Sequence, residues 1–409
     1  MVISYWVDTD IVNPGVWITV FLILIVGLNI FNVKVFGTVE FWLSMFKIFV
    51  MVSLMLLCVI IMAGGNSDRD PIGFRYWNNP GAFNTYIDQG SRGRFYAWWS
   101  TTGMATFAYL GTELIAITAG EAENPRQALP KAIKATFYRV LFFYVLTVFL
   151  LGAVVPFNSD KLSFARESSE GAAASPFVVA IQLAGIPVLP HILNAAILVF
   201  VISAANTDMY VGARTLHGLA KEKKAPAWFE KTTENGIPRR ALGCCAAFCL
   251  LAYANTSSDV RIIFGYFVTA VINCGLLVWL SILVSHICFV RARRAQGIHD
   301  KNLDYKAPFG VPGSVSACVF CIMMVLFKNY DVFTRGRSDK FDVGRFIASY
   351  LSIPVYVGLM IGYKLRRPCK RVDPMMADLM TDRAPVSQHS SGSPRTGKAV
   401  LPEMCVVAV

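Results

Sequence analysis

The chain of 409 residues is 55% hydrophobic and 16% charged, with a mean hydropathy of +0.51. That balance argues against a soluble globular protein of this length and favours a membrane protein. The formal net charge of +12 would suit a nucleic-acid partner. The basic residues flank the apolar runs, however, so the sequence predicts no nucleic-acid binding.

Nine apolar runs are long enough to form membrane-spanning helices. A bilayer core of about 30 Å requires about 20 mostly apolar residues per helix. Most of the proline, glycine and charged residues fall between the runs, as turns and loops require. Helices buried in a large soluble core would instead carry polar faces. The sequence therefore predicts an all-α membrane bundle with about nine spans, at residues 16–33, 41–63, 96–120, 138–156, 187–212, 241–256, 262–290, 312–330 and 343–364.

The distribution of basic residues sets the expected orientation. If the first span enters from outside, Lys and Arg balance Asp and Glu in the outer segments and outnumber them about two to one in the inner segments. The prediction is an extracellular N-terminal segment at 1–15, a transmembrane domain at 16–364 and a cytoplasmic, mostly disordered tail at 365–409.

Neither the cysteines nor the loops indicate a reactive centre. Most of the ten cysteines fall in or beside apolar runs, where they act as small hydrophobic residues. No Cys or His spacing is typical of a metal site. No loop combines a nucleophile, a base and oxyanion donors. We therefore expect no metal, no cofactor, no disulfide framework and no enzymatic activity.

Three ionisable residues lie in or near the spans: Lys47, Glu113 and Asp208. A charge at mid-membrane costs on the order of 3 kcal/mol on insertion scales, so such residues are retained for pairing or function. Lys47 lies seven residues from Glu40 and either snorkels to the inner interface or takes part in a proton relay. Glu113 is either a buried acid satisfied by its neighbours or a gate. For Asp208 a structural cap is favoured.

The run at 96–120 is expected to be broken. Gly103 and Gly111, together with Thr101, Thr102, Thr106 and Thr112, interrupt what would be a continuous apolar helix. Unwound helices occur at membrane depth only where they line a cavity or are buried in protein, and in transporters they hold substrate and coupling ion. The alternative is close helix packing through small residues.

Two long segments are FAYLGTELIAITAGEAENPRQALPKAIKATFYRV and VISAANTDMYVGARTLHGLAKEKKAPAWF. They resemble, respectively, the sixth helix with its following loop and the eighth helix with its following cytoplasmic loop of fungal amino-acid permeases, a family within the amino acid–polyamine–organocation superfamily. VFGTVEFWLSMFKIF, IGFRYWNNPGAF, ASPFVVAIQ and FVRARRAQG resemble further landmarks, in order, between about residues 5 and 372. IGFRYWNNPGAF and FDVGRFIASYLSIPVYVGLMIGYKL are most similar to the dicarboxylic amino-acid branch.

The resemblance implies two inverted five-helix repeats plus two further helices, of which the nine runs match helices four to twelve and the first three are absent. It implies that the unwound part of helix six, at Phe107, Ala108, Tyr109, Gly111 and Thr112, receives the substrate ammonium. By the same resemblance, coupling or gating is assigned to Glu113, Lys47, Ser203 and Asn206.

The function implied is proton-coupled amino-acid uptake across the plasma membrane, with an amino-acid substrate, protons and the lipid bilayer as partners. The alternative is an N-terminally truncated, transport-inactive fragment or a nutrient-sensing relative. Lys47 is the only cation placed within a span, and Lys328 is assigned to an outer loop. Acidic substrates are thus favoured by branch resemblance alone, since the donors near the predicted site are neutral: Thr106, Thr112, Ser203, Asn206, Thr269 and Asn273.

Overall fold

The computed structural model describes the chain in segments, and every regular element in them is a helix. The described residues are 2–7, 11–31, 33–66, 69–118, 125–160, 162, 175–186, 188–234, 236–256, 260–298, 306–334, 341, 343–366 and 372–379. The long helices are α2 (Val33–Met62), α9 (Leu189–Lys221), α11 (Val260–Ala295) and α12 (Gly310–Phe327).

The remaining helices are short or end at a break, as α3 (Gly90–Tyr109) does although its 20 residues make it longer than α12. α5 (Pro125–Val140) continues through a π-helical turn, Leu141–Val145, into α6 (Leu146–Val154). The others are α1 (Pro14–Ile30), α3 (Gly90–Tyr109), α4 (Ile115–Thr118), α8 (Pro176–Leu183), α10 (Arg239–Cys249), α13 (Asp331–Thr334), α14 (Val343–Tyr350) and α15 (Ser352–Arg366).

Among the described residues, five helical stretches are long and apolar enough to cross a membrane: Val35–Met62, Gln127–Val154, Leu189–Lys221, Ile263–Ala295 and Gly310–Phe327. The pair α14 and α15, bent by 40°, adds a sixth if it forms one span.

The three other predicted spans coincide with helices that are short or interrupted. The run at 16–33 corresponds to α1, which has 17 residues. The run at 96–120 ends as a regular helix at Tyr109, and the run at 241–256 changes from α10 to a 3-10 turn at Leu250–Thr256. Length and composition therefore establish a multi-pass membrane protein, while the count of nine spans and the inverted repeat stay predictions.

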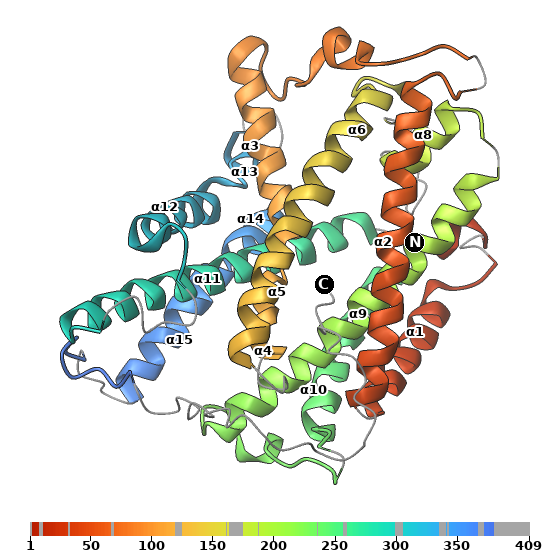
Figure 1. The fold of residues 1–409 in the computed structure, drawn as a ribbon. Coiled ribbons are helices and arrows are strands. Elements are labelled where there is room, and N and C mark those ends of the chain that lie inside the picture. Colours follow the sequence, from red (N-terminus) through yellow and green to blue (C-terminus); the bar gives the residue numbers. More distant parts are fainter. Residues whose placement is uncertain are drawn as a thin grey trace, which may run out of the picture.

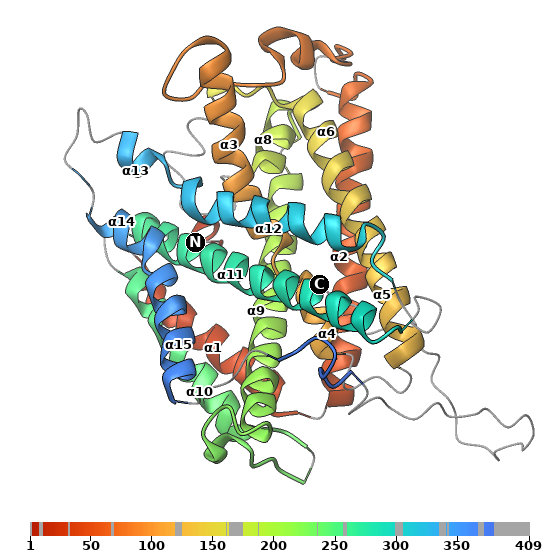
Figure 2. The same ribbon diagram turned by 90° about the vertical axis from the view of Figure 1, so that its left-hand side faces the viewer.

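The helices pack in two neighbouring groups (Figure 1). In one group α2 lies beside α6, and α9 crosses α2 and packs against α1, α8 and α10. In the other group α11 runs along α12 and also contacts α3, α14 and α15; Figure 2 shows α11 and α12 side by side. The broken segment from α3 to α4 connects the groups, because α3 contacts α11 and α4 contacts α9.

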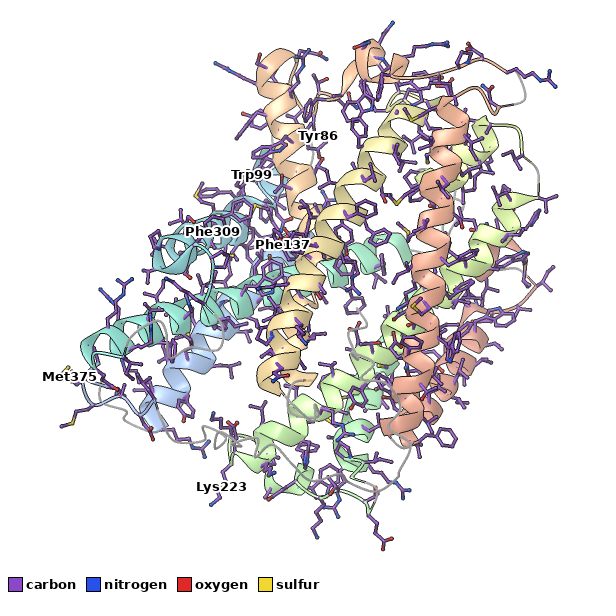
Figure 3. All side chains as sticks on the ribbon, viewed as in Figure 1. Tyr86, Trp99, Phe137, Lys223, Phe309 and Met375 are labelled. Carbon is purple, nitrogen blue, oxygen red and sulfur yellow. The ribbon has the colours of Figure 1, made fainter. Side chains whose placement is uncertain are left out.

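Buried side chains fill the contacts within each group. Cys58, Ile61, Val154 and Val179 are buried where α2, α6 and α8 meet. In a bilayer such packing acts through van der Waals contact, because lipid tails are as apolar as the side chains they replace. Many large apolar side chains point outward (Figure 3), as expected of helices that face lipid.

Candidate functional site

The helix α3 is interrupted at Gly111, one of the positions at which the break was predicted. Leu110 is extended, with ψ of 146°, and Gly111 adopts a left-handed conformation with φ of 96°. An L-residue with a side chain rarely adopts that φ, so glycine is required here. A 3-10 turn at Thr112–Leu114 and the short α4 follow. The chain thus presents free backbone groups within a predicted span.

The other small residues of α3 do not unwind it, contrary to expectation. Thr101, Thr102 and Thr106 donate their hydroxyls to the carbonyl four residues earlier, at 2.8, 2.8 and 3.0 Å. These bonds satisfy the hydroxyls within the helix. Gly103 instead makes room for a neighbour, since a Cβ there would lie 3.3 Å from the Cβ of Lys328.

The predicted substrate-binding carbonyls lie at the end of α3 and each already accepts one hydrogen bond. The donors are the Leu110 amide to Phe107 at 3.3 Å, the Tyr144 hydroxyl to Ala108 at 2.8 Å and the Thr112 hydroxyl to Tyr109 at 3.2 Å. A carbonyl oxygen has two lone pairs, so each can accept a second donor such as an ammonium group. The Tyr144 bond was not predicted, because no spacing rule relates it to α3.

Glu113 holds the break against α11. Its Oε2 accepts hydrogen bonds from the Trp279 indole at 2.9 Å and from the Gly111 amide at 3.2 Å. The two segments approach so closely that a Cβ added at Gly275 of α11 would overlap the side chain of Leu110. The carboxylate therefore links the conformation of the break to the position of α11. Trp279 and Gly275 were missed, since neither stands out within an apolar run.

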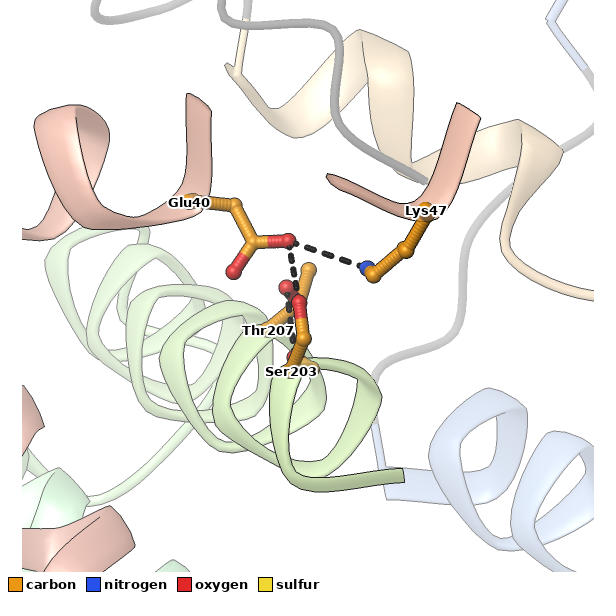
Figure 4. Close-up of polar contacts among 4 residues, drawn as sticks. All are labelled: Glu40, Lys47, Ser203 and Thr207. Carbon is orange, nitrogen blue, oxygen red and sulfur yellow. Dashed lines mark hydrogen bonds and ion pairs between the residues drawn. The ribbon is translucent and has the colours of Figure 1, made fainter. Parts of the chain in front are cut away.

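A second polar group lies between α2 and α9 (Figure 4). Glu40 Oε1 accepts from Lys47 Nζ at 3.3 Å and from the Ser203 hydroxyl at 2.7 Å. The side chain of Glu40 is 2% exposed and that of Lys47 is 24% exposed. Glu40 Oε2 has no hydrogen-bond partner among the described residues. The helix thus places a carboxylate and an ammonium group against one serine, with one carboxylate oxygen left over.

Asn206 lies one turn beyond Ser203 on α9 but bonds to a different helix. Its Oδ1 accepts from Asn29 Nδ2 of α1 at 2.9 Å, and Asn29 also donates to the Ile25 carbonyl at 2.9 Å. Asn206 is 1% exposed and Asn29 is 8% exposed. The predicted coupling residues therefore fall into three contacts: Lys47 and Ser203 together on Glu40, Asn206 on α1, and Glu113 on α11.

Glu40 was overlooked as a site residue. Its spacing of seven residues from Lys47 puts both on one face of a helix two turns apart, which is the signal that could have found it. From the sequence alone, the same spacing was also compatible with Lys47 snorkelling to the inner membrane interface. Only the packing of α9 against α2 shows that Glu40 is buried.

In the described residues every regular element is a helix, and five or six of the helices are long and apolar enough to cross a membrane. One of them, α2, carries a buried ion pair where it packs against α9, so the chain is an integral membrane protein. The model of the amino acid permease family matches residues 1–373. The chain belongs to the amino acid permease family. Its relatives are permeases, that is, transporters.

Three relatives illustrate the range of the family. The chain is 49% identical to the dicarboxylic amino acid permease of Saccharomyces cerevisiae, over 93% of this chain and 62% of that protein. It is 42% identical to an uncharacterised amino-acid permease of Schizosaccharomyces pombe, over 92% and 71%. It is 39% identical to the lysine-specific permease of Saccharomyces cerevisiae, over 93% and 61%. The chain thus spans less than two thirds of the length of the two Saccharomyces cerevisiae proteins.

Proposed function

We propose that the protein takes up amino acids across the plasma membrane together with protons, and that acidic amino acids are its preferred substrates. Two polar groups carry the proposal: the broken end of α3 with Glu113, and the Glu40–Lys47–Ser203 group between α2 and α9. In secondary transporters, broken helices hold the substrate and buried charges carry the coupling ion.

The break is the proposed substrate site. The carbonyls of Phe107, Ala108 and Tyr109 keep a free lone pair each for the substrate ammonium, and Gly111 and Thr112 shape the turn below them. Glu113 acts as a gate, because its bond to Trp279 closes the break against α11. Opening that bond would let α3 move away from α11.

The Glu40–Lys47–Ser203 group is the proposed proton site. A proton added at the unpartnered Glu40 Oε2 would neutralise the carboxylate and weaken its hold on Lys47 and Ser203. In a low dielectric that loss of attraction is large. The contact of α4 with α9 then provides the route by which the change at Ser203 reaches the break. Asn206 ties the same turn of α9 to α1.

The proposed arrangement in the membrane follows the distribution of charge. Nine spans with an inverted repeat place residues 1–15 outside, 16–364 in the bilayer region and 365–409 in the cytoplasm. The preference for acidic substrates is supported by the higher identity to the relative named a dicarboxylic permease than to the one named lysine-specific.

Uptake of radiolabelled glutamate tests the proposal, in cells that lack their own acidic amino-acid uptake and express this chain at the surface. We expect uptake above the empty-vector control, with aspartate the best competitor. If leucine or lysine displaces the label better than aspartate, the acidic preference is wrong. If the surface-exposed protein binds glutamate but none enters the cells, the protein is a sensor and the transport proposal is wrong.

A further inference from the structure

Lys328 is a buried cation that pairs with no carboxylate among the residues the structure describes. It lies just after α12, is 7% exposed, and its Nζ donates to the carbonyl of Thr269 on α11 at 3.3 Å. No ion pair between Lys328 and a carboxylate occurs in the part of the chain that the structure describes. An ammonium group taken out of water costs several kcal/mol unless an anion or several acceptors compensate it, and one carbonyl compensates little.

Capping of the C-terminal end of α12 does not explain why the Lys328 side chain is buried. The carbonyl of Phe327 accepts from the Trp99 indole at 2.9 Å, and that of Leu326 from the Tyr350 hydroxyl at 3.1 Å. Figure 3 labels Trp99, which comes from α3. The last carbonyls of α12 are therefore bonded by other residues, and Lys328 reaches across to α11 instead.

Lys328 lies on the same helix interface as the proposed substrate site. Gly103 of α3 faces the Lys328 side chain, and Leu110 at the break faces Gly275 of α11. Thr106, which is 7% exposed, falls between them at helical spacing, so these positions form one face of α3. Gly103 is five residues from Ala108, or about 7.5 Å along the axis at 1.5 Å per residue.

We propose that Lys328 binds the side-chain carboxylate of an acidic amino acid whose ammonium group lies at the α3 break. This inference rests on the proposed function and names the group that selects its substrates. Gly103, which faces Lys328, and Ala108 at the break are about 7.5 Å apart along the axis of α3, and an extended dicarboxylic amino acid with a hydrogen bond at each end spans that rise. Because charge-assisted bonds are stronger than neutral ones, a carboxylate would replace the Thr269 carbonyl as the main acceptor.

The interface must open for that contact to form. In the present arrangement Gly103 and Leu110 pack against α12 and α11, so a substrate reaches Lys328 only as α3 separates from them. The Trp279–Glu113 bond is the contact that has to break at the inner end of this face. Lys328 is thus a specificity residue of the open site and rests on Thr269 when the site is closed.

Ligand binding to the purified full chain in detergent tests the inference, with radiolabelled glutamate and glutamine as probes. Lys328→Met keeps the length of the side chain and removes its charge. We expect it to weaken glutamate binding at least about tenfold, as loss of one charged bond implies, and to leave glutamine binding within about threefold. Lys328→Arg should retain glutamate binding within about threefold.

Lys231→Met is the matched control, because Lys231 is exposed between α9 and α10 and its loss removes the same charge. It should bind both ligands as the wild type does. Unchanged glutamate binding in Lys328→Met, or equal loss of glutamate and glutamine, overturns the inference. If the wild-type protein binds glutamine but not glutamate, the inference about Lys328 is wrong, whereas amino-acid binding by the protein is supported. Wild-type protein that binds no amino acid overturns the proposed function with it.

Discussion

At the residue scale, the central feature is a carboxylate shared by two donors. Glu40 is almost fully buried, and Lys47 remains about one quarter exposed, with 24% of its side chain accessible. A buried ion pair contributes little net stability compared with apolar packing, but removal of one partner leaves an uncompensated charge. Such a pair is therefore weak support for a stability role and fits a site that has to change its charge.

This asymmetry gives the first prediction. Glu40→Leu and Lys47→Leu should each lower the free energy of unfolding. Lys47→Leu should lower it more, by about 3 kcal/mol, because it leaves the buried Glu40 carboxylate without its cation, and the double variant should recover most of the loss. Thermal unfolding of the purified protein in detergent measures the effect. The exposed pair Lys224–Glu222, 2.6 Å apart, supplies the control, and Lys224→Ala should leave the melting temperature unchanged. Additive losses in the double variant would show that the two side chains are not coupled.

The same residues show the limit of prediction from sequence. Lys47, Glu113 and Gly111 stand out because charge and glycine are rare in apolar runs. Other contacts depend on which helices lie side by side, and no periodicity within one helix encodes that. These are the contacts of Trp279 and Tyr144 with the break, and of Glu40 with Ser203.

At the element scale, the break in α3 depends on two glycines. One is needed for its backbone conformation and the other for a close contact between helices. Gly111 supplies the left-handed residue, and Gly275 of α11 lets Leu110 approach. The expected break at Gly103 did not occur, because helical threonines satisfy their own hydroxyls and Gly103 packs on Lys328. A glycine in an apolar run thus has two structural uses, which the sequence does not separate.

The second prediction tests the contact at Gly275. Gly275→Ala should push Leu110 away and lower glutamate uptake about tenfold, since overpacking costs about 1–3 kcal/mol and small displacements of a site are expensive. Leu110→Ala in the same chain should restore much of the uptake. Gly265→Ala on the same helix is the control, because a Cβ there meets nothing within 4 Å. Equal uptake by Gly275→Ala and Gly265→Ala would exclude the contact as a determinant of the site.

At the scale of the whole molecule, the predicted helical class and family are confirmed, whereas the predicted count of nine spans stays a prediction. α1, α3 with α4, and α10 are helical where spans were predicted, yet each is short or interrupted. An interrupted span is too short or too polar to be identified from the length and composition of its helix. The same interruption leaves free backbone groups in the helix, and these groups suit a transport site.

The third prediction concerns topology. Nine spans place Asp88, before α3, outside the cell and Lys231, after α9, inside it. Both positions are exposed, so a cysteine can be introduced at each in a chain whose native cysteines are replaced by serine or alanine. The two cysteines should differ in their labelling from outside intact cells. A membrane-impermeant maleimide should label Asp88→Cys and should label Lys231→Cys only after permeabilisation. Labelling of both without permeabilisation would contradict the nine-span arrangement.

We propose that this chain couples amino-acid entry to proton entry. The most direct measurement is the luminal pH of proteoliposomes that contain the purified protein and a trapped pH-sensitive dye, after external glutamate is added. We expect the lumen to acidify in step with glutamate uptake, and both signals to disappear in Lys47→Ala. Glutamate uptake without any change of luminal pH would show that transport is not coupled to protons.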